Sequence, residues 1–366
     1  MDFETIVIGS SPVSLMNAFM RHQAGEHVKI VERDTEIGGV WKTGIAFGIA
    51  GVETTPHFFL PDPAGYAALR QILPHEYESF GSPAYMHIIG SPSLGTRKVP
   101  LNDSFEFHSS ILATTYLDAV QKSRWRRSKR YAKAMIRLMA KSPFRPATTQ
   151  PIYPVGGMAS WLKSMERHAS HLGITIEKHR TIVSVRETSD GVEIIDAEGK
   201  RDSARRLVLS GRTLLDQIEL QNGTFDLEPI EIESHHYSLA IKNQAPSGLV
   251  HYLGHPKLFL VNDVTRFAPA QFEEQYPGHR LIVARTVYRS GPKPTGAEVV
   301  EALKETEYLS NAAISNAENH WHLRQRFLSR NCLRALQNRM PTKVSVLSTA
   351  DLDIVGAAAR MMLAKP

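Results

Sequence analysis

The chain has 366 residues, of which 42% are hydrophobic and 22% charged, so it can hold one large α/β domain or two interleaved ones with a sizeable core. Its formal net charge of +6 comes from 43 lysines and arginines against 37 acids. The single cysteine, Cys332, excludes an intrachain disulfide and a cysteine-based metal site, and it indicates a reducing compartment.

The N-terminal residues are acidic and lead directly into a strand pattern, unlike a secretory signal. No run of about 18 apolar residues is available to span a bilayer. We therefore expect a cytoplasmic protein, with peripheral attachment to a membrane as the alternative.

The first 32 residues have the pattern of a nucleotide-binding βαβ unit. An apolar, β-branched run at residues 4–8 ends at Gly9 and predicts a buried parallel strand. Between Pro12 and Gln23, apolar residues recur at three- and four-residue spacings, which predicts a helix. A second strand is predicted over residues 27–31, directly before Glu32.

Such a unit binds dinucleotides by electrostatics and hydrogen bonding. The N-terminus of the helix directs unpaired N–H groups and a positive dipole end at a pyrophosphate. An acid at the end of the second strand, about 20 residues on, accepts hydrogen bonds from the adenosine ribose. Glu32 has this position and favours FAD or NAD over NADP, although Arg33 beside it counts against that preference.

The loop departs from the usual Gly-x-Gly-x-x-Gly motif. It reads Gly9-Ser10-Ser11-Pro12-Val13-Ser14, so Ser11 stands where backbone approaches phosphate and Ser14 where helix packs on strand. The segment therefore indicates nucleotide binding, with a βαβ unit that binds nothing as the alternative. Gly38 and Gly39, six residues after Glu32, are typical of two-domain flavoproteins.

The region between residues 83 and 150 contains two predicted strands, 84–89 and 97–101, and a basic segment at residues 122–145. This segment has ten lysines or arginines and no acid, with a basic stripe at helical spacing. One interpretation is a solvated helix face. The other is attraction to an anionic membrane surface or a polyanionic partner. Nucleic acid is disfavoured, because aromatic residues are not interleaved with the charges.

The next part of the chain alternates strands and helices. We predict a helix at residues 159–172, a strand at 173–177, a hairpin of strands 181–187 and 192–196, and a buried strand at 207–209. Further on, residues 235–241, 257–264 and 280–288 are predicted as strands and 296–333 as mainly helical.

The order of these elements after Pro154-Val155-Gly156-Gly157-Met158 resembles the flavin-containing amine oxidase superfamily, which includes protoporphyrinogen oxidase, phytoene desaturases and UDP-galactopyranose mutase. The resemblance implies an α/β fold with a Rossmann-like FAD-binding domain. That domain would comprise residues 1–60, 150–215 and 335–366. An inserted α+β substrate or cap domain would comprise residues 61–149 and 216–334.

The resemblance also implies FAD as the cofactor and a set of contacts to it. Ile182 would face the adenine through its backbone, and Asp351 and Asp353 match two aspartates of the mutase. Together with Arg33 beside the ribose acid, the expected cofactor-binding residues are Gly9, Ser11, Ser14, Glu32, Arg33, Gly38, Gly39, Gly156, Gly157, Ile182, Asp351 and Asp353.

Two residues are candidates for a catalytic role. His57, in Pro-His-Phe-Phe, resembles a mutase histidine, and a hydrogen-bonded core histidine is the alternative. Arg266 follows a predicted strand and could pair with an anionic substrate group, or it could be an exposed structural arginine. The histidine pairs at 235–236 and 320–322 have no convincing third and fourth partner, so no metal is expected.

The leading functional hypothesis is an FAD-dependent oxidoreductase (an oxidase, dehydrogenase or desaturase) that transfers hydride from a small-molecule substrate to flavin N5. One alternative is a flavin-dependent isomerase similar to the sugar-nucleotide mutase. The other is a flavin-free binding or scaffold protein of the same fold, which the two serines of the loop favour.

Overall fold

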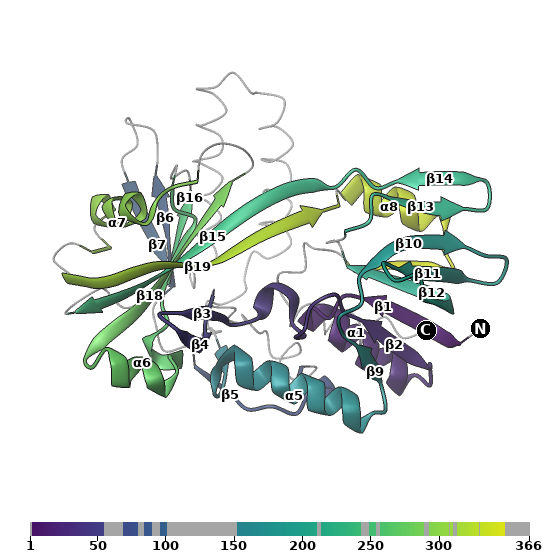
Figure 1. Cartoon of the computed structure of the whole chain (residues 1–366), viewed down its shortest axis with the longest axis horizontal. Helices are drawn as coiled ribbons and strands as arrows, with labels where there is room; N and C mark the ends of the chain where they lie inside the picture. Colours follow the sequence, from purple (N-terminus) through teal and green to yellow (C-terminus); the bar gives the residue numbers. More distant parts are fainter. Residues whose placement is uncertain are drawn as a thin grey trace, which may run out of the picture.

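The computed structural model describes residues 2–54, 69–79, 84–89, 96–100, 152–210, 214–242, 249–253, 257–288, 293–306, 308–309, 313–328 and 330–347. These residues form two large β-sheets at opposite ends of the molecule, joined by long strands, with helices on their faces (Figure 1). None of the helices in these ranges is long and apolar enough to cross a membrane.

The first sheet has nine strands in the order β14-β13-β10-β11-β12-β1-β2-β9, with β20 also paired to β12. It unites segments that lie far apart in the sequence. Its strands are β1 (Phe3–Ile8), β2 (Val28–Val31), β9 (Thr175–Glu177), β10 (Ile182–Glu187), β11 (Val192–Asp196), β12 (Arg201–Ser210), β13 (Gln217–Leu220), β14 (Gly223–Asp226) and β20 (Val344–Leu347).

The long strand β12 joins the parallel and antiparallel parts of this sheet. Along one edge it pairs in parallel with β1, and β1 pairs in parallel with β2. Along its other edge, the first half pairs antiparallel with β11 and the second half pairs in parallel with β20. The strand order around β1 is therefore that of a parallel nucleotide-binding sheet, and β10–β11 form the predicted hairpin.

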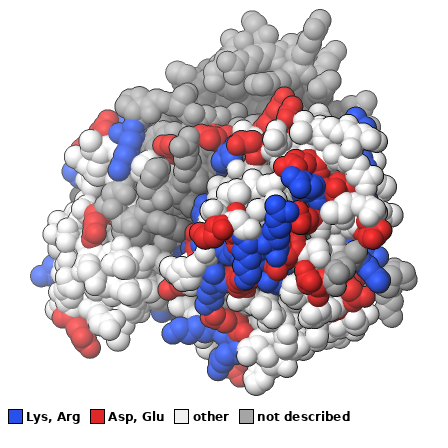
Figure 2. All heavy atoms as spheres, turned by 45° about the vertical axis from the view of Figure 1, so that its right-hand side comes forward, with Lys and Arg blue, Asp and Glu red and all other residues white. Residues whose placement is uncertain are grey.

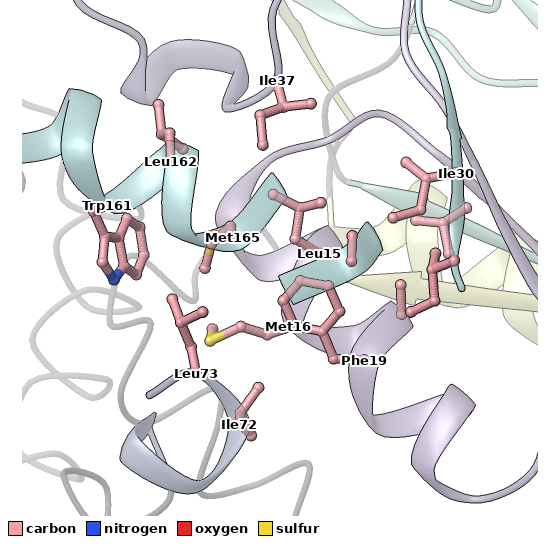
Figure 3. Packing of buried hydrophobic residues seen from close by; sticks show 14 of the residues in the cluster. Leu15, Met16, Phe19, Ile30, Ile37, Ile72, Leu73, Trp161, Leu162 and Met165 are labelled. Carbon is pink, nitrogen blue, oxygen red and sulfur yellow. The ribbon is translucent and has the colours of Figure 1, made fainter. Parts of the chain in front are cut away.

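Helices cover both faces of the first sheet, which explains why Ile6, Val7 and Ile8 of β1 are apolar in succession. Val7 and Val208 pack against α1 (Pro12–Gln23) and α5 (Gly157–His171), whereas Ile6 and Leu207 pack on the face covered by α8 (Arg330–Arg339). Figure 3 shows the first of these cores, built around Phe19 of α1 and Trp161 of α5. Both side chains are fully buried.

The second sheet has seven strands in the order β19-β15-β18-β17-β16-β6-β7. One face packs on α7 (Gly296–Glu305), and the other packs on the hairpin of β3 (Gly44–Ala46) and β4 (Ile49–Val52) and on α6 (Ala270–Gln275). Its strands are β6 (Ala84–Ile89), β7 (Thr96–Pro100), β15 (Ile230–Lys242), β16 (Leu249–Leu253), β17 (Leu260–Asp263), β18 (His279–Tyr288) and β19 (Ala313–Phe327).

Four short elements complete the described structure. Strands β5 (Tyr77–Ser79) and β8 (Ile152–Pro154) pair antiparallel with each other ahead of α5. The 3-10 turns are η1 (Gly39–Trp41) and η2 (Thr265–Phe267).

The predicted helical region at residues 296–333 was wrong over its central part. After α7 the chain forms β19, a strand of 15 residues that pairs antiparallel with β15 along almost its whole length. Residues 315–317 are exposed and polar or small, so the first half of β19 has no apolar alternation to mark it as a strand. Its conformation is set by hydrogen bonding to a strand about 80 residues earlier in the chain.

The first sheet also extends beyond the boundaries that we placed at residues 215 and 335. Strands β13 and β14, at residues 217–226, hydrogen-bond to it, and α8 packs on it from residue 330 onward. The division of the chain into cofactor and substrate domains stays a prediction.

A buried charge cluster, made of Arg180, Lys29, Glu177, Asp196 and Asp202, ties β2, β9, β11 and β12 together. The Arg180 side chain is 3% exposed; its Nε lies 2.6 Å from Asp196, and its Nη1 contacts Glu177 and Asp202. Lys29 Nζ lies 2.6 Å from Glu177 and 2.7 Å from Asp202. Figure 2 shows basic and acidic side chains intermixed on the side of the molecule that the first sheet forms.

We predict that Arg180→Ala lowers the free energy of unfolding by about 3 kcal/mol, because it leaves the buried Asp196 carboxylate without a cation. The matched control is Arg201→Ala on β12, whose side chain is 59% exposed and lies 3.3 Å from Glu193. An exposed pair of this kind contributes less than about 1 kcal/mol. Urea unfolding of both variants measures the difference, and equal losses would show that the cluster has no special role.

Candidate functional site

The turn between β1 and α1 forms the centre of the candidate site. The Gly9 N–H donates to the Val31 carbonyl at 2.8 Å, which joins the end of β1 to the end of β2. Ser11 caps α1: its Oγ accepts from the Ser14 N–H at 3.3 Å and lies 2.8 Å from Ser14 Oγ. The N-terminus of α1, which starts at Pro12, therefore lies at the carboxyl ends of two adjacent parallel strands, as in dinucleotide-binding units.

Glu32 holds this turn by accepting hydrogen bonds from both sides. Its carboxylate is buried, with the residue 6% exposed. Oε2 accepts from the Ser10 N–H at 2.8 Å and from Ser10 Oγ at 2.5 Å, and Oε1 accepts from the Asp34 N–H at 2.8 Å. Ser10 in turn receives the Gly38 N–H at its carbonyl oxygen, 3.0 Å away, and at its Oγ, 3.2 Å away. The two turns and the glycine pair thus form one hydrogen-bonded unit.

Gly38 lies between this unit and α5, at a place where no side chain fits. Its φ is +111°, and a Cβ built on it would lie 2.6 Å from Leu162 Cδ1. A Cβ on Gly39 would lie 3.8 Å from the Cα and Cβ atoms of Ser11. The glycine pair therefore brings the chain directly over the cap of α1.

Two further expected contacts lie next to the same unit. The Arg180 N–H donates to the Glu32 carbonyl at 2.9 Å, so the start of β10, with Ile182, lies beside the end of β2. The side chain of Ile182 packs in the core under α8. Gly156 and Gly157 begin α5, the helix whose Leu162 touches Gly38.

Other predicted residues have partners within the chain or lie outside the described residues. Ser14 is fully buried in the first turn of α1. Arg33 is half-exposed and pairs with Asp34 at 2.8 Å. The catalytic candidate His57, the last two cofactor candidates Asp351 and Asp353, and the basic segment at residues 122–145 all lie outside the described residues, so their roles stay predictions.

Arg266, the second catalytic candidate, lies on the 3-10 turn η2 and is engaged by other groups. Its Nη1 donates to the Ser79 carbonyl at 3.0 Å, and its Nη2 pairs with Glu78. An anionic substrate would have to compete with Glu78 for this guanidinium. Its catalytic role also stays a prediction.

The turn fits the adenosine end of a dinucleotide, with fewer free donors than an all-glycine loop. Oε1 of Glu32 accepts one hydrogen bond and so retains a second acceptor position for a ribose hydroxyl. In the first turn of α1, Pro12 has no N–H and the Ser14 N–H donates to Ser11, which leaves the Val13 N–H for a phosphate oxygen.

Glu53, just after β4, is a buried acid that the sequence analysis missed. It is 3% exposed, and its Oε1 accepts from the Met158 N–H at 2.8 Å, in the first turn of α5. A Cβ on Gly157 would lie 2.9 Å from the same oxygen, so Glu53 fits there because residue 157 has no side chain. A lone acid in an apolar stretch, directly after Gly51-Val52, was the signal that could have identified it.

Burial raises the pKa of Glu53 to about 7, although hydrogen bonds from the Met158 N–H and from Tyr153 favour the ionised form. Burial also raises the pKa of the Tyr153 hydroxyl, and the neighbouring Glu53 carboxylate adds to that effect. The ring of Tyr153 stacks on Phe267 of η2 at a centroid distance of 4.0 Å. Glu53 thus lies near the start of α5 and near η2, the turn between β17 and β18 of the second sheet. It holds a proton near neutral pH.

Within the described ranges, no group of three His, Cys, Asp or Glu side chains is placed to hold a metal ion. No protein-family model and no curated protein sequence matches this chain.

Solved structures with the same overall fold cover almost the whole chain. An oxidoreductase from Methanosarcina mazei is 14% identical with a TM-score of 0.59, covering 98% of this chain and 99% of its own. Reduced UDP-galactopyranose mutase is 11% identical with a TM-score of 0.61, over 99% of this chain and 93% of its own. Putrescine oxidase bound to putrescine is 13% identical with a TM-score of 0.53, over 100% of both chains.

These similarities confirm, at the level of the fold, the predicted resemblance to the amine oxidase-like flavoproteins. Identities of 11–14% leave the reaction to be argued from the residues of this chain.

We predict that Glu53 makes the folded state less stable as pH rises from about 5 to about 7. The folded protein keeps the Glu53 proton up to about pH 7, whereas the unfolded chain releases it near 4.5. Folding therefore takes up a proton in this window, and the free energy of unfolding falls by up to about 3 kcal/mol. Glu53→Gln removes this slope, because the amide cannot ionise, so the variant should gain up to about 3 kcal/mol of stability relative to the parent between pH 5 and pH 7. A difference that is constant from pH 5 to 8 contradicts the assignment.

Proposed function

We propose that this chain binds FAD at the β1–α1 turn and is an FAD-dependent oxidoreductase acting on a small molecule. The observation that carries the proposal is the Glu32 unit: a buried acid at the end of β2 that joins the Gly9 turn to the Gly38–Gly39 segment, at the N-terminus of α1. This arrangement occurs in a fold shared with flavoproteins over the whole chain.

Each part of the unit has a role in holding the cofactor. The start of α1 would meet the pyrophosphate with its positive dipole end and the Val13 N–H. Glu32 Oε1 would accept a hydrogen bond from the adenosine ribose. Gly39 lies beside Ser11, where an added Cβ would be in van der Waals contact, and the glycine pair leaves the surface of the turn without bulky side chains.

Bound flavin supplies the redox chemistry, which is acceptance of a hydride from a substrate C–H bond at N5. The chain orients the substrate and excludes water, so the reaction does not depend on a strong catalytic base. Glu53, neutral below about pH 7, can hold a proton without placing a charge in the interior. An external acceptor takes the electrons and completes the cycle.

The second candidate function is a flavin-dependent isomerase. It is favoured by the mutase, whose structure superposes on 99% of this chain with a TM-score of 0.61. The two activities differ in the redox state that they require. A dehydrogenase bleaches its oxidised flavin when substrate is added without air, whereas a mutase turns over a sugar nucleotide only after its flavin has been reduced.

A flavin-free binding protein is the third candidate, and the Ser11–Ser14 pair favours it. These hydroxyls lie 2.8 Å apart and occupy the cap of α1 with each other. The absorption spectrum separates this candidate from the first two, since oxidised protein-bound flavin absorbs near about 370 and 450 nm.

We predict that Glu32→Ala weakens FAD binding by about 10- to 100-fold, because a charge-assisted hydrogen bond to the ribose and the support of the turn are both lost. Glu32→Gln keeps the shape and should lose about 10-fold. The matched control is Glu36→Ala, an exposed acid four residues further on, which should bind as the parent does.

Quenching of flavin fluorescence on titration with apoprotein measures the three affinities, and urea midpoints show whether each variant is folded. Parent-like affinity in a folded Glu32→Ala variant places the cofactor elsewhere. A folded parent that binds no FAD supports the flavin-free alternative.

A further inference from the structure

One face of the second sheet carries polar side chains that have no role in the proposed function. This is the face that packs on the β3–β4 hairpin through Ala240, Leu281 and Val283. Side chains alternate along a strand, and directly opposite residues of paired strands share a face. The face can therefore be followed along β15, β18 and β17 from these three residues.

Toward the other end of the same strands this face becomes polar. Ser238 lies opposite Val283, which in turn lies opposite Asn262, and His236 lies opposite Arg285. Ser234 follows two residues further along β15. We call these five residues the polar strip: Ser234, His236, Ser238, Asn262 and Arg285.

The polar strip faces the part of the molecule that contains the candidate cofactor site. The His236 Nδ1–H donates to the Thr54 carbonyl at 2.5 Å, directly after Glu53. Leu260, opposite Arg285 on β17, packs into the hydrophobic core that contains α1 and α5. The strip therefore lies on the face of the second sheet that contacts Thr54 and the core of α1 and α5, opposite the face covered by α7.

The strip contains polar atoms that are buried without hydrogen-bond partners. Asn262 is 0% exposed, and both its Oδ1 and its Nδ2 lack a partner. The same holds for the Ser234 hydroxyl, in a residue that is 1% exposed. An unpaired buried polar group lowers stability, and buried polar groups in native proteins are nearly always paired. These atoms are therefore available to hydrogen-bond a ligand.

Arg285 is the charged member of the strip. Its Nε is buried without a hydrogen-bond partner, and no described carboxylate forms an ion pair with it. Its guanidinium lies 5.4 Å from the centroid of the Phe259 ring. Burial lowers the pKa of Arg285 to about 10, which leaves it fully charged at neutral pH. The residue as a whole is partly buried, and its buried Nε is a hydrogen-bond donor that an anion would satisfy.

We propose that the polar strip binds the carboxylate of a small-molecule substrate, with Arg285 pairing with the carboxylate and Asn262 hydrogen-bonding a neighbouring polar group. In an antiparallel sheet, residues on diagonal positions of adjacent strands lie about 7–8 Å apart, which suits two ends of one small molecule. The binding rests on the strip alone, whereas its role in substrate recognition rests on the proposed flavin-dependent function.

A single charge favours a carboxylate over a diphosphate. Among the five residues of the polar strip, Arg285 is the one guanidinium or ammonium group, and it has no described carboxylate partner. Arg280, on the same strand, belongs to the opposite face and pairs with Asp263. A diphosphate has more than one negative charge and would need further cations, whereas a planar carboxylate matches one guanidinium in a bidentate pair.

The test uses the flavin-free full chain and three probes of similar size: benzoate, benzylamine and phenyl phosphate. Thermal unfolding is followed over a range of probe concentrations. Benzoate should raise the midpoint in a saturable manner, and benzylamine should not. Arg285→Met should weaken the apparent benzoate affinity by at least about 10-fold, whereas Arg280→Met, on the opposite face of β18, should leave it unchanged.

Stability without a probe gives a second and independent readout. Arg285→Met removes a partly buried charge that has no described carboxylate partner, so this variant should be at least as stable as the parent. Arg280→Met leaves Asp263, whose side chain is 4% exposed, without its cation, so it should be less stable. If Arg285→Met loses as much stability as Arg280→Met, Arg285 is structural and the inference is overturned.

The remaining outcomes are equally decisive. Equal effects of benzoate and benzylamine, or unchanged benzoate binding by Arg285→Met or Arg285→Gln, overturn the site. Tighter binding of phenyl phosphate than of benzoate contradicts the proposal that the ligand of the polar strip is a carboxylate. FAD affinity is measured separately: FAD binding without benzoate binding refutes only this inference, and benzoate binding without FAD binding refutes only the flavin-dependent function.

Discussion

The buried carboxylate of Glu32 is the constraint on which the candidate site depends. A carboxylate in the interior is stable only when hydrogen-bond donors surround it. Here the donors are the Ser10 N–H and hydroxyl and the Asp34 N–H, and Ser10 also accepts the Gly38 N–H. The end of β1, the end of β2 and the glycine pair are consequently held at fixed positions relative to one another, ahead of any ligand.

The parts of the fold that could be predicted are those that local pattern determines. The apolar run at residues 4–8, the helix starting at Pro12 and the hairpin of β10 and β11 occur where the sequence predicts them, because periodicity and turn residues act over short distances. The position of Glu32 followed from the spacing of these elements. The resemblance in motif order supplied the fold class, which periodicity alone does not specify.

What could not be predicted depends on contacts between distant segments. The first half of β19 has no apolar alternation of its own and is a strand because β15 lies beside it. Glu53 is buried because Gly157, more than 100 residues later, leaves room for its carboxylate. The polar strip combines Asn262 and Arg285 from different strands, and only the register of β17 on β18 shows that they share a face. Unpaired polar groups in this strip lower stability, as expected of a binding site that is optimised for its ligand.

The most direct test of this account is a crystal structure of the protein grown with FAD. The account predicts the adenosine ribose within hydrogen-bonding distance of Glu32 Oε1 and the pyrophosphate at the start of α1, with the Ser10–Glu32–Gly38 hydrogen bonds unchanged. Density for the dinucleotide at another place, or a Glu32 carboxylate enclosed by protein donors with no nucleotide beside it, would contradict the account.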